Sequence, residues 1–204
     1  MSMTKKILML VTGVLILSLG TVICMKTTLG IDPFNAFCIG VSRTIGFNLG
    51  PTALVINIIL IAFILLLKRS LIGIATVFIM FFLGYIISFF EAIIPDIAFP
   101  FLSILNIAVF VIGMFFTCFG AAVYFESMLG MAPYDSIAFV VADRLGGKTF
   151  VYRVILDCSV ALIALLLGGP ISLGTIILAF GLGPIIDFFR FQVVNKYIKK
   201  SDSL

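Results

Sequence analysis

The sequence has no histidine and very little charge. Histidine is the commonest general base and metal ligand in proteins, so its absence removes the first candidate for both roles. Only 11% of the 204 residues are charged and 63% are hydrophobic, and the mean hydropathy is +1.35. A water-soluble domain needs far more polar surface than these few charges supply. The sequence therefore predicts an all-α polytopic membrane protein.

Cysteine is also scarce, and its spacing gives no sign of metal or redox chemistry. No two cysteines form a C-x-x-C pair, and all lie in apolar surroundings, where free cysteine behaves as a small hydrophobic residue. No nucleophile, base and orienting group stand together in the sequence. We therefore expect no enzymatic activity, no catalytic residue, no metal and no cofactor. The cysteines are Cys24, Cys38, Cys118 and Cys158.

Several apolar runs are long enough to cross a bilayer, which takes roughly 20 apolar residues per helix. The first follows a basic start and lacks a small-residue cleavage site, so we interpret it as an uncleaved span. The net charge of +4 comes in short basic clusters between apolar runs. This pattern is typical of topology signals and does not indicate nucleic-acid binding. The predicted spans are 7–25, 52–67, 71–90, 102–125, 150–167 and 171–189.

The chain repeats itself at an offset of one hundred residues. Both apolar and polar positions match in the same order, which is a stronger signal than apolar matches alone. Near the end of each half the offset falls by one, where LGYIISFF from Leu83 matches LGPIIDFF from Leu182. We expect two membrane repeats, 1–100 and 101–204, that form one structural domain. The matched pairs are Gly20 and Gly120, Leu29-Gly30 and Leu129-Gly130, Pro33 and Pro133, Gly46 and Gly146, and Asn57 and Asp157.

Each half also contains a short element that begins at a proline. Proline suits the first turn of a helix, and Asp32 can cap the helix that starts at Pro33. The apolar stretch after Pro33 or Pro133 gives roughly 20 Å of helix, too short for the ~30 Å hydrocarbon core. We expect two re-entrant half-helices. With three full spans per half, the second half is then inverted, and the half-helices enter from opposite faces and meet near the midplane.

The basic residues support this topology. With six spans and two re-entrant elements, most of them fall on one side together with both termini, and the positive-inside rule makes that side cytoplasmic. Eight full spans would move Lys68 and Arg69 outside in exchange for Arg43, a poorer distribution. The residues on the predicted cytoplasmic side are Lys5, Lys6, Lys68, Arg69, Arg144, Lys148, Arg190, Lys196, Lys199 and Lys200, and those opposite are Lys26 and Arg43.

Two motifs resemble those of the YczE/YyaS/YitT family of small bacterial integral membrane proteins. The first is Leu-Gly-x-x-Pro-aromatic-Asp, from Leu129 to Asp135. The second is a Gly-Thr pair at Gly174, followed by Gly-Pro-x-x-Asp from Gly183 to Asp187. The resemblance covers almost the whole chain. It implies a multi-pass protein of the bacterial cytoplasmic membrane, and it implies no particular substrate or reaction.

The second motif is degraded in the first half of the chain. Tyr85 and Ser88 stand where the second half has Pro184 and Asp187. The two halves have therefore diverged in polarity, and we expect the chemistry of the protein in the second half. Asp187 can pair with Arg190 near the cytoplasmic interface, where a charge costs little.

Polar residues inside the repeat are the candidates for a substrate-binding site, because a charge within the membrane costs about 2.5 to 3.5 kcal/mol on insertion scales. Asn35 and Asp135 stand two residues after each proline, where helix capping explains them equally well. Asp157 lies four residues after Arg153, and a structural ion pair is an equally good explanation. The candidate substrate-binding residues are Asp32, Pro33, Asn35, Asn57, Pro133, Tyr134, Asp135 and Asp157.

Two functions fit these observations. The first is a transporter or channel-like carrier of a small solute, with a midplane site between the two half-helices. The alternative is a non-transporting membrane subunit or an accessory or assembly factor that acts with a partner protein. The expected partners are the lipid bilayer and an unidentified small molecule or ion, without nucleic acid, and a homo-oligomer stays open. Asp32 and Asp135 would offset the positive helix ends, so a cation, an amine-bearing solute or proton coupling is as open as an anion.

Overall fold

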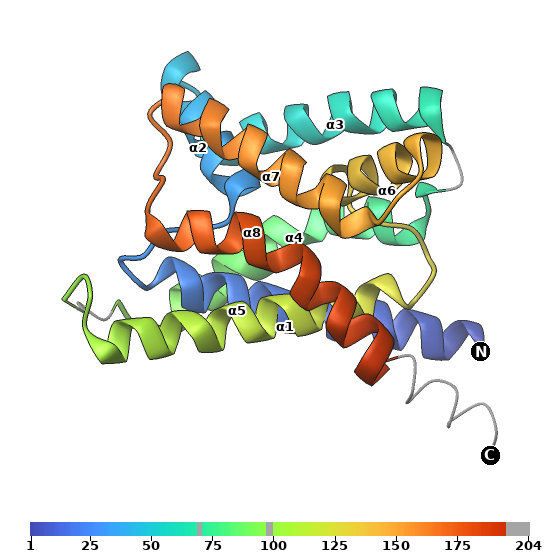
Figure 1. Cartoon of the computed structure of the whole chain (residues 1–204), viewed down its shortest axis with the longest axis horizontal. Coiled ribbons are helices and arrows are strands. Elements are labelled where there is room, and N and C mark those ends of the chain that lie inside the picture. Colours follow the sequence, from blue (N-terminus) through green and yellow to red (C-terminus); the bar gives the residue numbers. More distant parts are fainter. Residues whose placement is uncertain (69–70, 97–99, 195–204) are drawn as a thin grey trace.

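The computed structural model describes residues 1–68, 71–96 and 100–194, and helices make up nearly all of this part of the chain (Figure 1). The last helix continues directly into a short π-helix, η2. The elements are α1 (Met3–Met25), α2 (Pro33–Ile45), α3 (Leu49–Leu67), α4 (Ile74–Ile93), α5 (Ile104–Phe125), α6 (Pro133–Leu145), α7 (Thr149–Leu166), α8 (Leu173–Phe188) and η2 (Phe189–Val194).

Within the described residues, six helices are long and apolar enough to cross a membrane. They are α1, α3, α4, α5, α7 and α8 with part of η2, and each agrees with a predicted span to within a few residues. The prediction of an all-α polytopic membrane protein is confirmed. The other two helices, α2 and α6, have 13 residues each. At 1.5 Å per residue they are roughly 20 Å long, shorter than the ~30 Å hydrocarbon core.

Both short helices begin at the predicted prolines and end at glycine. The Asp32 side chain accepts a hydrogen bond from the Asn35 backbone N–H at 3.0 Å, so it caps α2 as predicted. Ala132 precedes Pro133 and provides no side-chain cap for α6. Gly46 ends α2 with φ 73°, in the left-handed region that favours glycine.

Helices α1 and α5 cross closely and run antiparallel (Figure 1). Four glycines form the crossing, with Gly13 against Gly120 and Gly20 against Gly113. A Cβ atom on Gly20 would lie 2.3 Å from the Thr117 backbone nitrogen, so only glycine permits this approach. Because Gly13 corresponds to Gly113 and Gly20 to Gly120 at the repeat offset, the two contacts are equivalent to each other.

The loops before the short helices make a second pair of equivalent contacts. The Leu29 carbonyl accepts from the Gly174 N–H at 2.7 Å, at the start of α8, and the Leu129 carbonyl accepts from the Ala75 N–H at 3.0 Å, at the start of α4. Helix α2 packs against α7 and α6 packs against α3, each in the other half of the chain. The contacts between the halves are therefore reciprocal.

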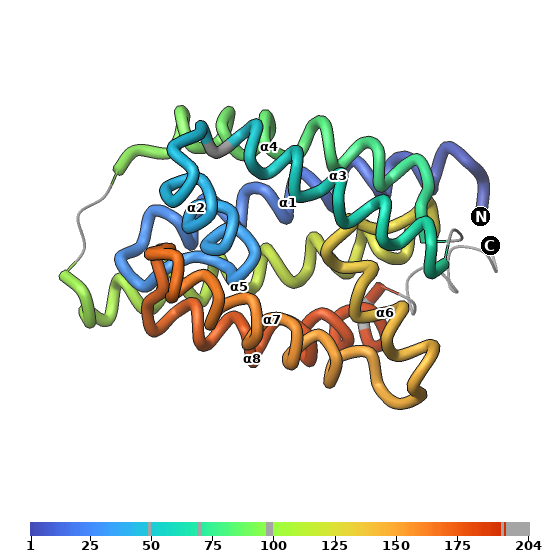
Figure 2. The backbone as a smooth tube through the Cα atoms, turned by 90° about the horizontal axis from the view of Figure 1, so that it is seen from above, coloured from blue at the N-terminus to red at the C-terminus, as the bar shows by residue number. Residues whose placement is uncertain are grey.

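The short helices point in opposite directions from the centre of the protein. Figures 1 and 2 show α2 and α6 toward opposite ends. The end of α6 lies beside the end of α3, where Lys68 and Asp143 form an ion pair with 2.7 Å between Nζ and Oδ2. The end of α2 lies beside the end of α7, where Arg43 donates to the Gly168 carbonyl at 2.9 Å. Four of the predicted cytoplasmic residues lie outside the described residues, namely Arg69, Lys196, Lys199 and Lys200.

Candidate functional site

A buried ion cluster joins α6 and α7. Arg153 on α7 donates to Asp157 one turn later, with 3.0 Å between Nε and Oδ2. It also donates to Asp135 on α6, with 2.5 Å between Nη1 and Oδ1. The side chains of Arg153, Asp135 and Asp157 are 13%, 14% and 1% exposed. The predicted Arg153–Asp157 ion pair is confirmed, and Asp135 is a further partner of the same guanidinium.

Two tyrosines complete the hydrogen bonding of the carboxylates. Tyr134 on α6 donates its hydroxyl to Asp157 Oδ1 at 2.5 Å. Tyr124 near the end of α5 donates its hydroxyl to Asp135 Oδ2. Each of the four carboxylate oxygens thus accepts from one donor, as buried charges require. The Arg153 guanidinium also lies 5.2 Å from the centroid of the Tyr134 ring. We call Tyr124, Tyr134, Asp135, Arg153 and Asp157 the Arg153 cluster.

The N-terminal ends of α2 and α6 meet beside this cluster. The rings of Phe34 and Tyr134 stack with 4.6 Å between their centroids. Each ring follows directly after the proline that starts its helix, and both Pro33 and Pro133 are buried. The junction of the two short helices is therefore closed by a pair of aromatic rings.

The structure brings together some of the predicted site residues and keeps others apart. Tyr134, Asp135 and Asp157 belong to the Arg153 cluster. The Asn35 amide donates instead to Asp32 Oδ2 at 2.7 Å, within its own helix end. Asn57 donates to the Ala53 carbonyl at 3.0 Å, one turn earlier in α3.

The sequence does not single out Tyr124 as a site residue. It lies in a long apolar run, and the one available signal was that a buried tyrosine hydroxyl needs a partner. Tyr124 is 1% exposed, so its hydroxyl lies in the protein interior. The position corresponds to Cys24 in the first half, which gave no reason to expect a polar contact there.

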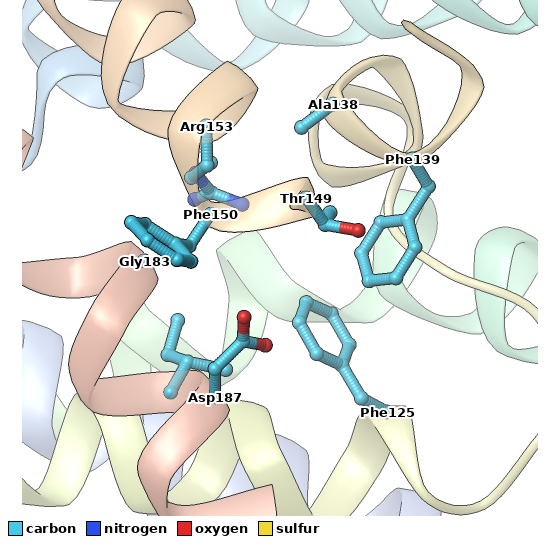
Figure 3. Close-up of a pocket in the computed structure, with 9 residues that line it drawn as sticks. Phe125, Ala138, Phe139, Thr149, Phe150, Arg153, Gly183 and Asp187 are labelled. Atoms are coloured by element: carbon cyan, nitrogen blue, oxygen red, sulfur yellow. The ribbon is translucent and has the colours of Figure 1, made fainter. Parts of the chain in front are cut away.

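A small pocket opens next to the cluster, between α5, α6, α7 and α8. In Figure 3 Arg153 and Asp187 face it from α7 and α8, with the rings of Phe125 and Phe139 to one side. Its volume of about 20 Å³ has room for about one water molecule. The pocket does not lie between the two prolines. Its lining is Phe125, Ala138, Phe139, Thr149, Phe150, Arg153, Gly183, Ile186 and Asp187.

A second ion cluster lies beside this pocket. Arg190 in η2 donates to Glu126, just after α5, with 2.9 Å between Nε and Oε1. The predicted pairing of Arg190 with Asp187 is also present, at 3.6 Å. The guanidinium lies 5.5 Å from the ring centroids of Phe125 and Phe139, which line the pocket. Arg190 therefore ties the end of α8 to α5 and α6.

The positions equivalent to this pair carry the opposite charges. Glu126 corresponds to Lys26 at the repeat offset, and Arg190 corresponds to Glu91 at the offset of ninety-nine that applies after Leu83. Lys26 pairs with Asp96 at 2.5 Å. Glu91 is exposed near the end of α4 and has no ion pair with any residue that the structure describes. Only one of the two equivalent pairs is formed.

The charges of the Arg153 cluster have no equivalents in the first half of the chain. At the repeat offset, its five residues correspond to residues without a formal charge, which are Cys24, Phe34, Asn35, Ala53 and Asn57. The shared fold of the halves therefore does not require the charges.

Comparisons with known proteins agree with the membrane architecture. The chain is 29% identical over 177 residues to the uncharacterized membrane protein YczE of Bacillus subtilis, covering 86% of this chain and 81% of that protein. It is 27% identical over 197 residues to YyaS of the same organism, covering 93% and 94%. It is 28% identical to an uncharacterized protein of Haemophilus influenzae, covering 91% and 83%.

No solved structure matches the chain. A family model described as "Family of unknown function (DUF6198)" matches residues 4–191, which is most of the sequence. Together with the helices described above, this match confirms the expected relationship to YczE and YyaS. The chain is an integral membrane protein that belongs to the DUF6198 family.

Proposed function

We propose that this protein is a transporter or channel-like carrier of a small solute, and that its substrate binds where α2 and α6 meet. The observation that carries the proposal is the Phe34–Tyr134 stack between two half-length helices, directly beside a buried ion cluster. Ionisable groups within apolar helices are costly and are typical of solute and proton pathways. Broken or half-length helices whose ends meet inside the protein are typical of transporter sites.

We further propose that residues 1–100 and 101–204 are inverted repeats. The antiparallel crossing of α1 and α5 supports this, since these helices are the first spans of the two halves. An approximate two-fold axis within the membrane plane would exchange Gly13 with Gly113 and Gly120 with Gly20. Phe34 and Tyr134 would lie on either side of that axis, because two residues that the axis exchanges can touch only next to it.

Two re-entrant helices follow from this arrangement. Helix α2 would enter from the face that carries Arg43 and Gly168, and α6 from the face that carries Lys68 and Asp143. Backbone that ends inside a membrane is tolerated where protein buries it, as at Pro33 and Pro133. The face with Lys68 is the proposed cytoplasmic face of the bacterial membrane, and the chain would act without catalysing a reaction.

The proposed substrate-binding residues form two groups about the aromatic pair. Pro133, Tyr134, Asp135 and Asp157 lie on the side of the Arg153 cluster, and Asp32, Pro33 and Asn35 lie at the start of α2. Asn57 is the most remote, on α3, which packs against α6. Movement of the two rings apart would connect the groups.

The proposal is tested by flux through the purified protein alone. Proteoliposomes would be screened with labelled inorganic cations, amines, amino acids and small carboxylic acids. We expect saturable uptake of one class, lost in Tyr134→Ala and retained in Phe63→Ala, which removes an exposed ring from α3. Uptake that appears only when a co-purifying protein is added would contradict autonomous transport and favour the accessory-subunit alternative.

A further inference from the structure

We infer that the Asp32 carboxylate and the Thr21 and Thr117 hydroxyls bind a sodium ion, and, resting on the proposed function, that this ion is coupled to transport. The three residues line a small cavity between α1, the start of α2, α5 and α8, together with Cys24 and Leu178. We call Thr21, Asp32 and Thr117 the Asp32 site. Its cavity shares no lining residue with the pocket of Figure 3.

Asp32 is a carboxylate without a cation. Its two oxygens accept from the backbone N–H and the side-chain amide of Asn35, at 3.0 and 2.7 Å. Both donors are neutral, and Asp32 forms no ion pair with any residue that the structure describes. Asp135 and Asp157, by contrast, share the guanidinium of Arg153. The N-terminus of α2 offsets only about half of the charge of Asp32, so the remainder is left to a ligand.

The polar groups of the Asp32 site have only acceptor capacity left. Thr21 donates its hydroxyl to the Leu17 carbonyl at 3.0 Å, and Thr117 donates its hydroxyl to the Gly113 carbonyl at 2.9 Å. Each hydroxyl oxygen keeps lone pairs after its hydrogen is used. The carboxylate has about four lone-pair positions, of which Asn35 fills two. A lining with oxygen lone pairs and no free O–H suits a cation and disfavours an anion.

The glycine crossing of α1 and α5 brings the two hydroxyls to the same cavity. A Cβ atom on Gly20 would lie 2.6 Å from Thr117 Oγ1, so the threonine hydroxyl takes the space that a side chain at Gly20 would need. Thr21 follows directly in α1 and is only 7% exposed. Closely packed backbone therefore holds both hydroxyls, and a ligand does not have to order them.

The size and charge of the cavity favour Na⁺. Its volume is about 10 Å³, at the lower limit for one water molecule. Na⁺ is smaller than water, whereas K⁺ and ammonium are about as large as water. A single carboxylate balances one positive charge, and oxygen ligands suit hard cations. Within the described ranges no group of three or more Cys, Asp or Glu side chains is placed to hold a metal of higher charge.

The repeat shows that these oxygens are not a requirement of the fold. At the repeat offset the three residues of the Asp32 site correspond to apolar residues, which are Ala121, Ala132 and Leu17. Helix α6 follows Ala132 without a side-chain cap and has the same 13 residues as α2. A half-helix thus forms at the equivalent position without a carboxylate, so capping alone does not account for Asp32.

Sodium binding to the purified protein tests the inference without a substrate. The melting temperature in detergent would be followed while NaCl replaces KCl at constant ionic strength. We expect a rise that saturates with Na⁺, and equilibrium binding of radioactive Na⁺ should give about one ion per chain. Asp32→Asn should abolish both effects, because asparagine can still cap α2 but carries no charge.

Thr117→Val should weaken Na⁺ binding by about tenfold or more, because it removes one contact to a charged group. Thr12→Val is the matched control. Thr12 also lies on α1 and donates to a carbonyl one turn earlier, that of Leu8, but it is exposed and does not line the cavity. This control should bind Na⁺ as the wild type does.

Equal stabilisation by Na⁺ and K⁺, or Na⁺ binding that persists in Asp32→Asn, would overturn the inference. If Asp32→Asn does not fold, the comparison of the wild type with Thr117→Val and Thr12→Val still decides. Solute flux that is independent of Na⁺ would refute the coupling and leave the ion site standing. Na⁺ binding without flux of any solute would count against the proposed function alone.

Discussion

Phe34 and Tyr134 stack with their ring planes 25° apart, although one hundred residues separate them in the chain. Tyr134 alone has a hydroxyl, and that hydroxyl binds Asp157. Tyr134 thus also supports the ion cluster, whereas Phe34 has no polar group and contributes only its ring.

Tyr134→Phe should keep the stack and remove the hydrogen bond to Asp157. Hydrogen bonds to charged groups contribute about 1.5–3 kcal/mol, so we expect a loss of stability in that range. Denaturation of the purified protein in detergent would measure it. Tyr152→Phe is the control, because the Tyr152 hydroxyl donates to the Gly146 carbonyl at an exposed site. Equal losses for both variants would contradict a special contribution from Tyr134.

Arg153→Met should be the most damaging change in the cluster, because it leaves two carboxylates without their cation. Loss of one partner of a buried ion pair costs about 3–5 kcal/mol. The double change Arg153→Met with Asp157→Leu should recover only part, since Asp135 remains uncompensated. Adding Asp135→Leu should recover more. Melting curves of the single, double and triple variants would show this order, and a triple variant no better than the single would disprove the coupling.

Cysteines at Asn48 and Lys148 should be labelled from opposite sides of the membrane. These equivalent positions precede α3 and α7, both are exposed, and inverted repeats place them on opposite faces. In a background without the native cysteines, an impermeant thiol reagent outside intact cells should reach Asn48→Cys and not Lys148→Cys. Labelling of both from one side would refute the inversion. Ser70, which is expected on the same side as Lys148, lies outside the described residues.

Gly20→Ala should destabilise the protein severely, because its Cβ would meet the backbone of Thr117 in the other half. Gly84→Ala is the control, since no atom lies within 4 Å of a Cβ there. At Gly84 we expect a gain of up to about 1 kcal/mol from helix propensity. Yield and melting temperature in detergent would separate the two variants. A tolerated Gly20→Ala would show that the crossing of α1 and α5 adjusts easily.

The main helices could be predicted from the sequence because each depends on local composition. Span length and the helix starts at Pro33 and Pro133 follow from hydropathy and backbone chemistry, and the structure has them at the expected residues. The Asp32 cap is equally local. These features need no knowledge of the neighbouring helices.

The partners of Arg153 could be predicted only in part. Asp157 lies four residues away on the same helix, so spacing was sufficient. Asp135 and Tyr124 come from other helices, and their contacts depend on how α5, α6 and α7 pack. For the same reason the sequence could predict that the two half-helices meet, but not that they do so through Phe34 and Tyr134 while the Asn35 amide donates to Asp32. Whether these residues bind a substrate stays a prediction.

The reversed charges at the two faces would bear on the energy of the transport cycle that we propose. In the described state Arg190 binds Glu126, and the equivalent Glu91 and Lys26 are not joined. If transport exchanges the shapes of the two halves, one pair opens as the other closes. The Arg190–Glu126 pair would then be replaced by a Lys26–Glu91 pair, for which Lys26 exchanges its present partner Asp96. Arg190 belongs to the pair at one face, and Glu91 to the equivalent pair at the other. A single substitution at Arg190 would therefore remove only one of the two pairs and shift the balance between the two access states toward the state with the other pair.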